Sequence, residues 1–148
     1  MVKTINYSEL EGEYVLVDVR SPKEYEEATI PGAINIPLFT NEERALIGTV
    51  YKQQSTEKAK RLGVEAVSKK LPQIFNDLME IHKQHKKIVL FCARGGMRSG
   101  SLAALLNSLG LRVERIKDGY KGYRAFINES LPKVNEGVKY IVDHSILP

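Results

Sequence analysis

The feature that most constrains this chain is an apolar run that leads directly into its only cysteine. Residues 88–91 read Ile-Val-Leu-Phe, and Cys92 follows them. Two glycines and two arginines come next, and then leucines recur at helical spacing over 102–109 before Gly110. This pattern predicts a buried strand, a tight loop and a helix. Because open α/β sheets bind ligands at the carboxyl ends of their strands, we expect the functional site at Cys92.

The residues after the predicted strand have the chemistry of an anion-binding loop. Seven residues run from Cys92 to Arg98, a Cys-x5-Arg spacing, and Ser99 follows. Loop N–H groups, the start of a helix and arginine charges favour a bound anion, and they also favour thiolate over thiol. Cys92 is therefore predicted to be a catalytic nucleophile. We expect Ser99 to cap the helix and to offer a hydroxyl group. The predicted anion-binding residues are Ala93, Arg94, Gly95, Gly96, Met97, Arg98 and Ser99.

Composition indicates an ordinary globular domain. The 148 residues are 43% hydrophobic and 27% charged, with a net charge of +4 that permits RNA or phosphate ligands without requiring them. One cysteine excludes an intrachain disulfide, and the pair His82 and His85 has too few ligands for a metal site. No signal peptide or membrane span is visible, so we expect a cytoplasmic protein with no membrane partner, metal or bound cofactor.

Strand and helix patterns alternate along the chain. Strands are predicted at 2–6, 14–19, 33–36, 88–91 and 112–116. Helical segments are predicted at 7–10, at 23–28, on both sides of a break at Gly48-Thr49 within 40–62, from 63 onward, at 102–109 and from 120. Pro72 indicates either two helices or one kinked helix. The alternation predicts an α/β fold with about five parallel strands and helices on both faces of the sheet.

Two segments outside the cysteine loop carry a family resemblance. Residues 18–25 read Asp-Val-Arg-Ser-Pro-Lys-Glu-Tyr, and residues 30–37 read Ile-Pro-Gly-Ala-Ile-Asn-Ile-Pro. Together with the loop they resemble the rhodanese superfamily. Thr29 stands where a histidine often precedes the second segment, and Tyr123 stands where many members carry tryptophan. The resemblance implies a rhodanese-like fold, and we expect Asp18 and Arg20 to pair at the end of a strand.

Three segments point to one branch of that superfamily. Residues 41–54, 92–99 and 118–124 resemble the rhodanese domain of bacterial tRNA 2-selenouridine synthases, and Gly-Thr-Val-Tyr-Lys at 48–52 is the most specific of these matches. Ordinary thiosulfate sulfurtransferases have a six-residue loop, whereas this loop has seven residues. The resemblance implies exchange of sulfur for selenium at the 2-position of the wobble uridine in tRNA, with selenophosphate as the selenium donor.

The same resemblance implies a domain organisation and partners. Residues 1–130 are expected to form the rhodanese-like domain, and 131–148 a C-terminal helix or a linker toward a P-loop domain that would act in cis or in trans. Aromatic and basic side chains suit stacking on RNA and neutralising its charge. The predicted tRNA or substrate contacts are Tyr51, Lys52, Tyr120, Lys121 and Arg124.

Other functions fit parts of the pattern. A Cys-x5-Arg loop also resembles cell-cycle phosphatases built on the rhodanese fold, but Phe91 stands where those enzymes usually have histidine, and the loop holds no general acid. A stand-alone persulfide carrier and a non-enzymatic docking module also remain open. A nucleotide-binding P-loop is excluded because Ser101 stands where that motif requires lysine.

Overall fold

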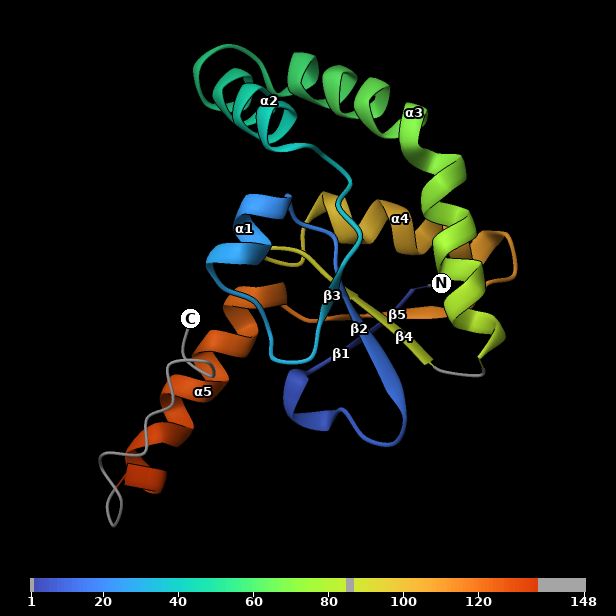
Figure 1. The fold of residues 1–148 in the computed structure, drawn as a ribbon. Coiled ribbons are helices and arrows are strands. Elements are labelled where there is room, and N and C mark those ends of the chain that lie inside the picture. The colour runs from blue at the N-terminus through green and yellow to red at the C-terminus, as the bar shows by residue number, and fades with distance from the viewer. Residues whose placement is uncertain (1, 85–86, 136–148) are drawn as a thin grey trace.

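A five-stranded parallel sheet forms the centre of the protein. The computed structural model describes residues 2–84 and 87–135, with side chains up to residue 131 (Figure 1). The strands lie in the order β1-β5-β4-β2-β3, and every pairing is parallel. They are β1 (Lys3–Ile5), β2 (Tyr14–Asp18), β3 (Ile34–Asn35), β4 (Lys87–Phe91) and β5 (Val113–Ile116). The predicted α/β architecture is confirmed, and the strand before Cys92 is the central one.

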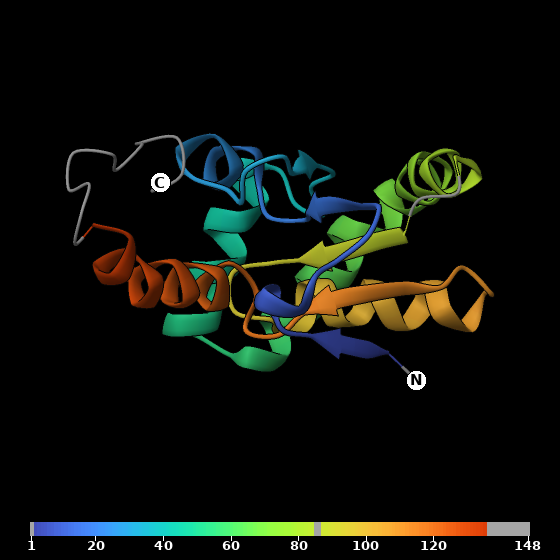
Figure 2. The ribbon, with the colours of Figure 1, turned by 90° about the horizontal axis from the view of Figure 1, so that it is seen from below.

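Helices cover both faces of the sheet, as predicted (Figures 1 and 2). The short helix η1 (Tyr7–Glu9), α1 (Pro22–Glu27) and α5 (Gly119–Asn135) pack on one face. On the other face lie α3 (Thr56–Lys83) and α4 (Met97–Ser108), while α2 (Asn41–Gln53) packs mainly against α3. Because both faces are covered, the side chains of residues 88–91 are fully buried, which explains the continuous apolar run.

Tyr123 belongs to the core on the α5 face. Its side chain is buried, and its ring lies edge-on to that of Tyr7 with the ring centres 4.8 Å apart. Burial, together with the nearby Tyr7 and Tyr120, raises the pKa of Tyr123 to about 12. The Tyr123 ring therefore helps to hold η1 and α5 together on this face of the sheet.

The predicted helix break at Gly48-Thr49 is wrong. Helix α2 runs without interruption through both residues, and the chain turns instead at Gln54 and Ser55, where the Ser55 side chain accepts a hydrogen bond from the N–H of Lys58 at 3.2 Å. A glycine inside a helix costs only about 1 kcal/mol relative to alanine, which packing of α2 against α3 can offset. Of the two interpretations of Pro72, the single helix is correct, since α3 spans 28 residues and changes direction partway along (Figure 1).

The leucine pattern after the cysteine loop forms α4 and ends before Gly110, as predicted. Leu102 and Leu106 are buried in the core, whereas Leu109 is 60% exposed. Part of the stripe borders an apolar groove of about 350 Å³ between α3 and α4. Its lining residues are Ser68, Leu71, Pro72, Phe75, Leu105, Leu106 and Leu109.

The domain boundary expected near residue 130 falls inside α5, which continues to Asn135. Residues 136–148 lie outside the described part of the chain, so the assignment of 131–148 as a helix or linker toward a further domain stays a prediction. Within the described residues, no helix is both long enough and apolar enough to cross a bilayer.

Candidate active site

Cys92 lies immediately after the central strand, at the carboxyl edge of the sheet. Its side chain is 2% exposed and belongs to the core cluster beneath α3 and α4. Its carbonyl oxygen accepts a hydrogen bond from the N–H of Tyr120 at 2.8 Å, and the carbonyl of Ala93 accepts one from Lys121 at 3.0 Å. The start of α5 therefore holds the first residues of the loop through backbone contacts.

The Cys92 thiol has the polar contacts of an ionisable nucleophile. Its Sγ atom lies 3.1 Å from the Oγ atom of Ser99. Burial opposes ionisation, but the hydroxyl and N–H of Ser99, the charge of Arg98 and the N–H of Gly96 outweigh it and lower the pKa of Cys92. The capping role expected of Ser99 is wrong: Gly96 is the N-cap of α4, and the buried Ser99 hydroxyl contacts the thiol instead.

Backbone geometry turns the loop toward the thiol. Gly95 has a φ of 68°, a left-handed conformation that favours glycine. The guanidinium of Arg115, on β5, donates from Nη1 to the carbonyl oxygens of Gly95 at 2.8 Å and Gly96 at 3.3 Å. The Arg115 contacts hold these two carbonyls while the N–H of Gly96 is directed to Cys92. Arg115, which lies outside the loop, thus supports the backbone of the predicted anion-binding loop.

The Asp118-Gly119-Tyr120-Lys121-Gly122 segment packs directly against the loop. A Cβ atom on Gly119 would lie 2.3 Å from the carbonyl oxygen of Cys92, and one on Gly122 would lie 2.5 Å from the carbonyl oxygen of Lys117. Real Cβ atoms do not approach other atoms so closely. Gly119 is therefore required for close backbone packing of α5 on the cysteine loop, and Gly122 for the tight turn that connects β5 to α5.

Arg98, the last residue of the loop, is anchored by a carboxylate from α1. Its Nη1 atom donates to Oε1 of Glu24 at 2.9 Å, and the Arg98 side chain is 15% exposed. The same carboxylate oxygen accepts from the N–H of Ser21 at 3.1 Å and its hydroxyl at 2.9 Å, in the capping box of α1. Burial opposes ionisation of Glu24, but Arg98 and Ser21 outweigh it and lower its pKa to about 2.

The lowered pKa of Glu24 predicts an acid-sensitive contribution to stability. A depressed folded-state pKa stabilises the fold above the ordinary value of 4.5, and that stabilisation is lost as the pH falls from 4.5 to about 2. We expect about 1–2 kcal/mol, less than the full shift gives because solvent screens the partly exposed carboxylate. Urea unfolding between pH 6 and pH 3 measures it. The Glu24→Gln variant should lack this part of the pH dependence, and an unchanged slope in that variant would contradict the assignment.

Asp18 and Arg20 form the predicted pair at the end of β2. The Arg20 guanidinium donates to the Asp18 carboxylate from Nε at 3.0 and 3.1 Å and from Nη2 at 2.8 Å, and both side chains are buried. The hydroxyl of Thr29 donates to the same carboxylate at 2.9 Å, from the position where the family often has histidine. The Arg20 guanidinium also lies 4.4 Å from the centre of the Tyr120 ring. The pair therefore connects β2 with the start of α5.

The remaining predicted site residues lie at three places. Arg94 and Met97 are exposed on the cysteine loop. Tyr51 and Lys52 are exposed near the end of α2, while Lys121 is exposed and Tyr120 and Arg124 are half-buried at the start of α5. In Figure 1, α2 and α5 lie on two sides of α1. The five proposed RNA contacts thus form two separate groups, and their role stays a prediction.

Sequence reasoning assigned no role to three side chains that support the loop. Glu24 stands in the Ser-Pro-Lys-Glu signature, whose Ser-x-x-Glu spacing is itself a capping signal. Arg115 interrupts the apolar pattern of β5, and Arg44 on α2 has its Nε atom 3.4 Å from Oε1 of Glu24. In the sequence each of these residues stands out only as a charged residue in a strand or near the start of a helix. Their sequence spacing does not show that all three act on the cysteine loop.

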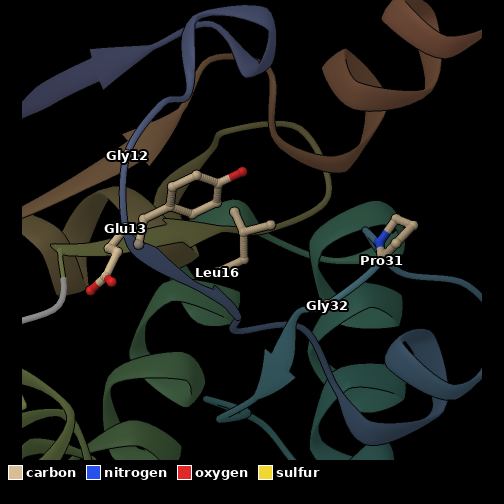
Figure 3. Close-up of a pocket in the computed structure, with 6 residues that line it drawn as sticks. Gly12, Glu13, Leu16, Pro31 and Gly32 are labelled. Atoms are coloured by element: carbon tan, nitrogen blue, oxygen red, sulfur yellow. The ribbon is translucent and has the colours of Figure 1, made fainter.

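A separate pocket lies at the opposite, amino edge of the sheet (Figure 3). It measures about 430 Å³, and its lining residues are Gly12, Glu13, Tyr14, Leu16, Pro31 and Gly32. The only charged side chain among them is Glu13, whose carboxylate points away from Leu16 and Pro31 in Figure 3. The pocket therefore has no positively charged side chain among its lining residues to bind an anion. Among the described residues, no three His, Cys, Asp or Glu side chains are placed to hold a metal ion.

The fold and the cysteine loop define a rhodanese-like domain. The family model for this domain matches residues 6–126, and the chain belongs to that family. It is 39% identical over 128 residues to a tRNA 2-selenouridine synthase of Nitrosomonas europaea and 38% identical to that of Nitrosomonas eutropha. Each match covers 86% of this chain and 33% of the relative, so the chain spans about a third of their length.

A solved structure shares the fold of this chain. The crystal structure of the N-terminal domain of a protein named as an ATP/GTP-binding protein, from Clostridium difficile 630, superposes with a TM-score of 0.80 at 44% identity. The match covers 84% of this chain and 98% of that domain. The shared fold therefore extends over most of the chain, as does the match to the family model.

Proposed function

We propose that this chain is the chalcogen-transfer domain of a tRNA 2-selenouridine synthase. In this proposal Cys92 accepts selenium and passes it toward the 2-position of the wobble 2-thiouridine. The observation that carries it is the Cys92 thiol, whose pKa is lowered by Ser99, Arg98 and Gly96 at the end of the central strand. The two relatives named tRNA 2-selenouridine synthases support the choice of substrate.

The proposed step is attack of the Cys92 thiolate on a terminal selenium or sulfur atom. An S–Se or S–S bond forms at Cys92, and the bond between that atom and its carrier group breaks. The carrier group leaves with the bonding electron pair: thiosulfate gives sulfite, and selenophosphate gives an oxyanion at the oxidation level of phosphite. Arg98 and the loop N–H groups would stabilise the negative charge of the departing group. With no second cysteine in the chain, the chalcogen must pass to an external acceptor. Transfer of the selenium to the uridine carbon also needs two electrons from an external thiol, which breaks the S–Se bond and restores the Cys92 thiol.

Two partners belong to the proposal. The first is tRNA, for which the exposed Tyr51, Lys52 and Lys121 supply aromatic and basic contacts. The second is a P-loop domain in cis or in trans. It is supported by the relatives' greater length and by the solved domain's origin in a protein named for ATP/GTP binding. Selenophosphate is proposed as the donor substrate, with no resident cofactor.

The carboxyl group that contacts the cysteine loop does not suit the proton donor of a phosphatase. Glu24 is the carboxyl group that contacts the arginine of the loop, and its pKa of about 2 means that it is ionised at neutral pH. An ionised carboxylate cannot protonate the leaving oxygen of a phosphate ester. The geometry therefore favours chalcogen transfer over ester hydrolysis.

Mass spectrometry of the intact chain after incubation with each donor tests the proposal. We expect Cys92 to gain one selenium atom from selenophosphate and one sulfur atom from thiosulfate, each removed by added thiol. Phosphorus NMR should detect phosphite in the selenophosphate reaction. An adduct from thiosulfate alone would indicate a sulfur carrier, and the absence of any Cys92 adduct would overturn the proposed chemistry.

A further inference from the structure

We propose that Arg44 of α2 is a positioning residue for the cysteine loop, acting on Arg98 through the carboxylate of Glu24. The inference rests on the proposed function, in which the loop receives an anionic donor. It assigns a functional role to residues 41–54, the segment that resembles tRNA 2-selenouridine synthases.

Two guanidinium groups from distant parts of the chain approach one oxygen atom. Oε1 of Glu24 lies 2.9 Å from Nη1 of Arg98 and 3.4 Å from Nε of Arg44. The Arg44 Nε atom is buried and makes no hydrogen bond to the described residues. Its contact with Glu24 is therefore one of charge. Helix α2 is thus electrostatically connected to the last residue of the cysteine loop.

Gly48 makes room for this contact. It lies one helical turn after Arg44, and a Cβ atom there would be 2.7 Å from Nη1 of Arg44. Glycine is unfavourable inside a helix, yet α2 contains it five residues before its last residue, Gln53. The space left by the missing side chain is occupied by the guanidinium group that reaches Glu24. The Gly-Thr-Val-Tyr-Lys segment is thereby tied to the site through its first residue.

The charges around Cys92 determine the direction of the effect. The positive charge of Arg98 favours the Cys92 thiolate. Arg94 is exposed on the loop, and Arg115 binds the loop carbonyls. The negative charge of Glu24, in contact with Arg98, opposes the positive potential of these arginines. With Arg44 present, the Glu24 carboxylate is shared between two positive charges, those of Arg98 and Arg44. Without Arg44, that carboxylate offsets more of the Arg98 charge. The loop should then bind anions less tightly and favour the thiolate less.

Four variants separate this role from a structural one: Arg44→Ala, Arg44→Lys, Gly48→Ala and Gly63→Ala. Gly48→Ala displaces the Arg44 guanidinium while raising helix propensity. Gly63→Ala is its matched control, because Gly63 also lies inside a helix, α3. A Cβ atom at Gly63 makes only an ordinary 3.4 Å contact with the Phe39 ring. Inorganic phosphate serves as the anion, and its affinity is read from protection of Cys92 against iodoacetamide. The thiolate is titrated by its ultraviolet absorbance, relative to the Cys92→Ser variant.

We expect Arg44→Ala and Gly48→Ala to weaken phosphate binding by about two- to fivefold, the range of a partly exposed ion pair. Both should shift the thiolate titration to higher pH without lowering the thermal midpoint. Arg44→Lys should restore most of both readouts, and Gly63→Ala should change neither. Unchanged phosphate affinity and titration in Arg44→Ala, or equal effects of Gly48→Ala and Gly63→Ala, would overturn the inference. Neither readout needs a chalcogen donor, so this failure is distinct from failure to form a Cys92 adduct.

Discussion

Replacement of Cys92 by serine is expected to abolish the proposed chalcogen transfer, with a loss on the order of a thousandfold or more. Serine is close to cysteine in size and can still meet the Ser99 hydroxyl, so the fold should be kept. The hydroxyl is far less acidic than a thiol, and a serine oxygen does not form the S–S or S–Se bond that carries the chalcogen. Release of sulfite from thiosulfate, with cyanide as acceptor, measures the loss.

A graded variant makes this expectation sharper. Ser99→Ala removes one hydrogen bond to the thiol but leaves the nucleophile, so we expect a smaller loss of about tenfold, together with a thiolate titration shifted to higher pH. A thermal midpoint equal to that of the unaltered chain would show that each variant is folded. Full function of the Cys92→Ser variant in cells would favour a domain that only docks a partner, with the loop as a recognition surface.

The parts of the site that are local in sequence could be predicted from it. An apolar run ending in Cys92 and followed by glycines and arginines is a contiguous signal, and the structure places β4, the loop and α4 in that order. The contact of Arg98 with Glu24 joins residues 74 positions apart. Nothing in the spacing of the two residues identifies them as partners. The pairing follows only from the parallel sheet, which brings the end of β2 beside the end of β4.

The two local errors have a common physical origin. The glycine at position 48 suggested a helix end, and Ser99 suggested a helix cap, because both residue types favour those places in isolated peptides. Tertiary contacts decide otherwise in each case. Gly48 accommodates the Arg44 guanidinium within a continuous α2, and the Ser99 hydroxyl contacts the Cys92 thiol inside the first turn of α4.

Replacing Gly119 by alanine should disrupt the site through the backbone. Gly119 has a φ of 55°, and a Cβ atom there would lie 2.3 Å from the carbonyl oxygen of Cys92 and 2.8 Å from the backbone nitrogen of Gly95. Neither neighbour is the end of a flexible side chain, so the loop or the start of α5 must move. We expect a loss of about 2–5 kcal/mol in the free energy of unfolding, from left-handed strain and overpacking together.

Gly110→Ala is the matched control for that prediction. Gly110 also has a positive φ, of 88°, but a Cβ atom there would meet nothing within 4 Å. Only backbone strain remains, so we expect about 1–2 kcal/mol and an unchanged Cys92 titration. Urea unfolding compares the stabilities, and thiolate absorbance reports the loop. Equal losses in the two variants, or an unaltered titration in folded Gly119→Ala, would mean that α5 does not support the geometry of the cysteine loop.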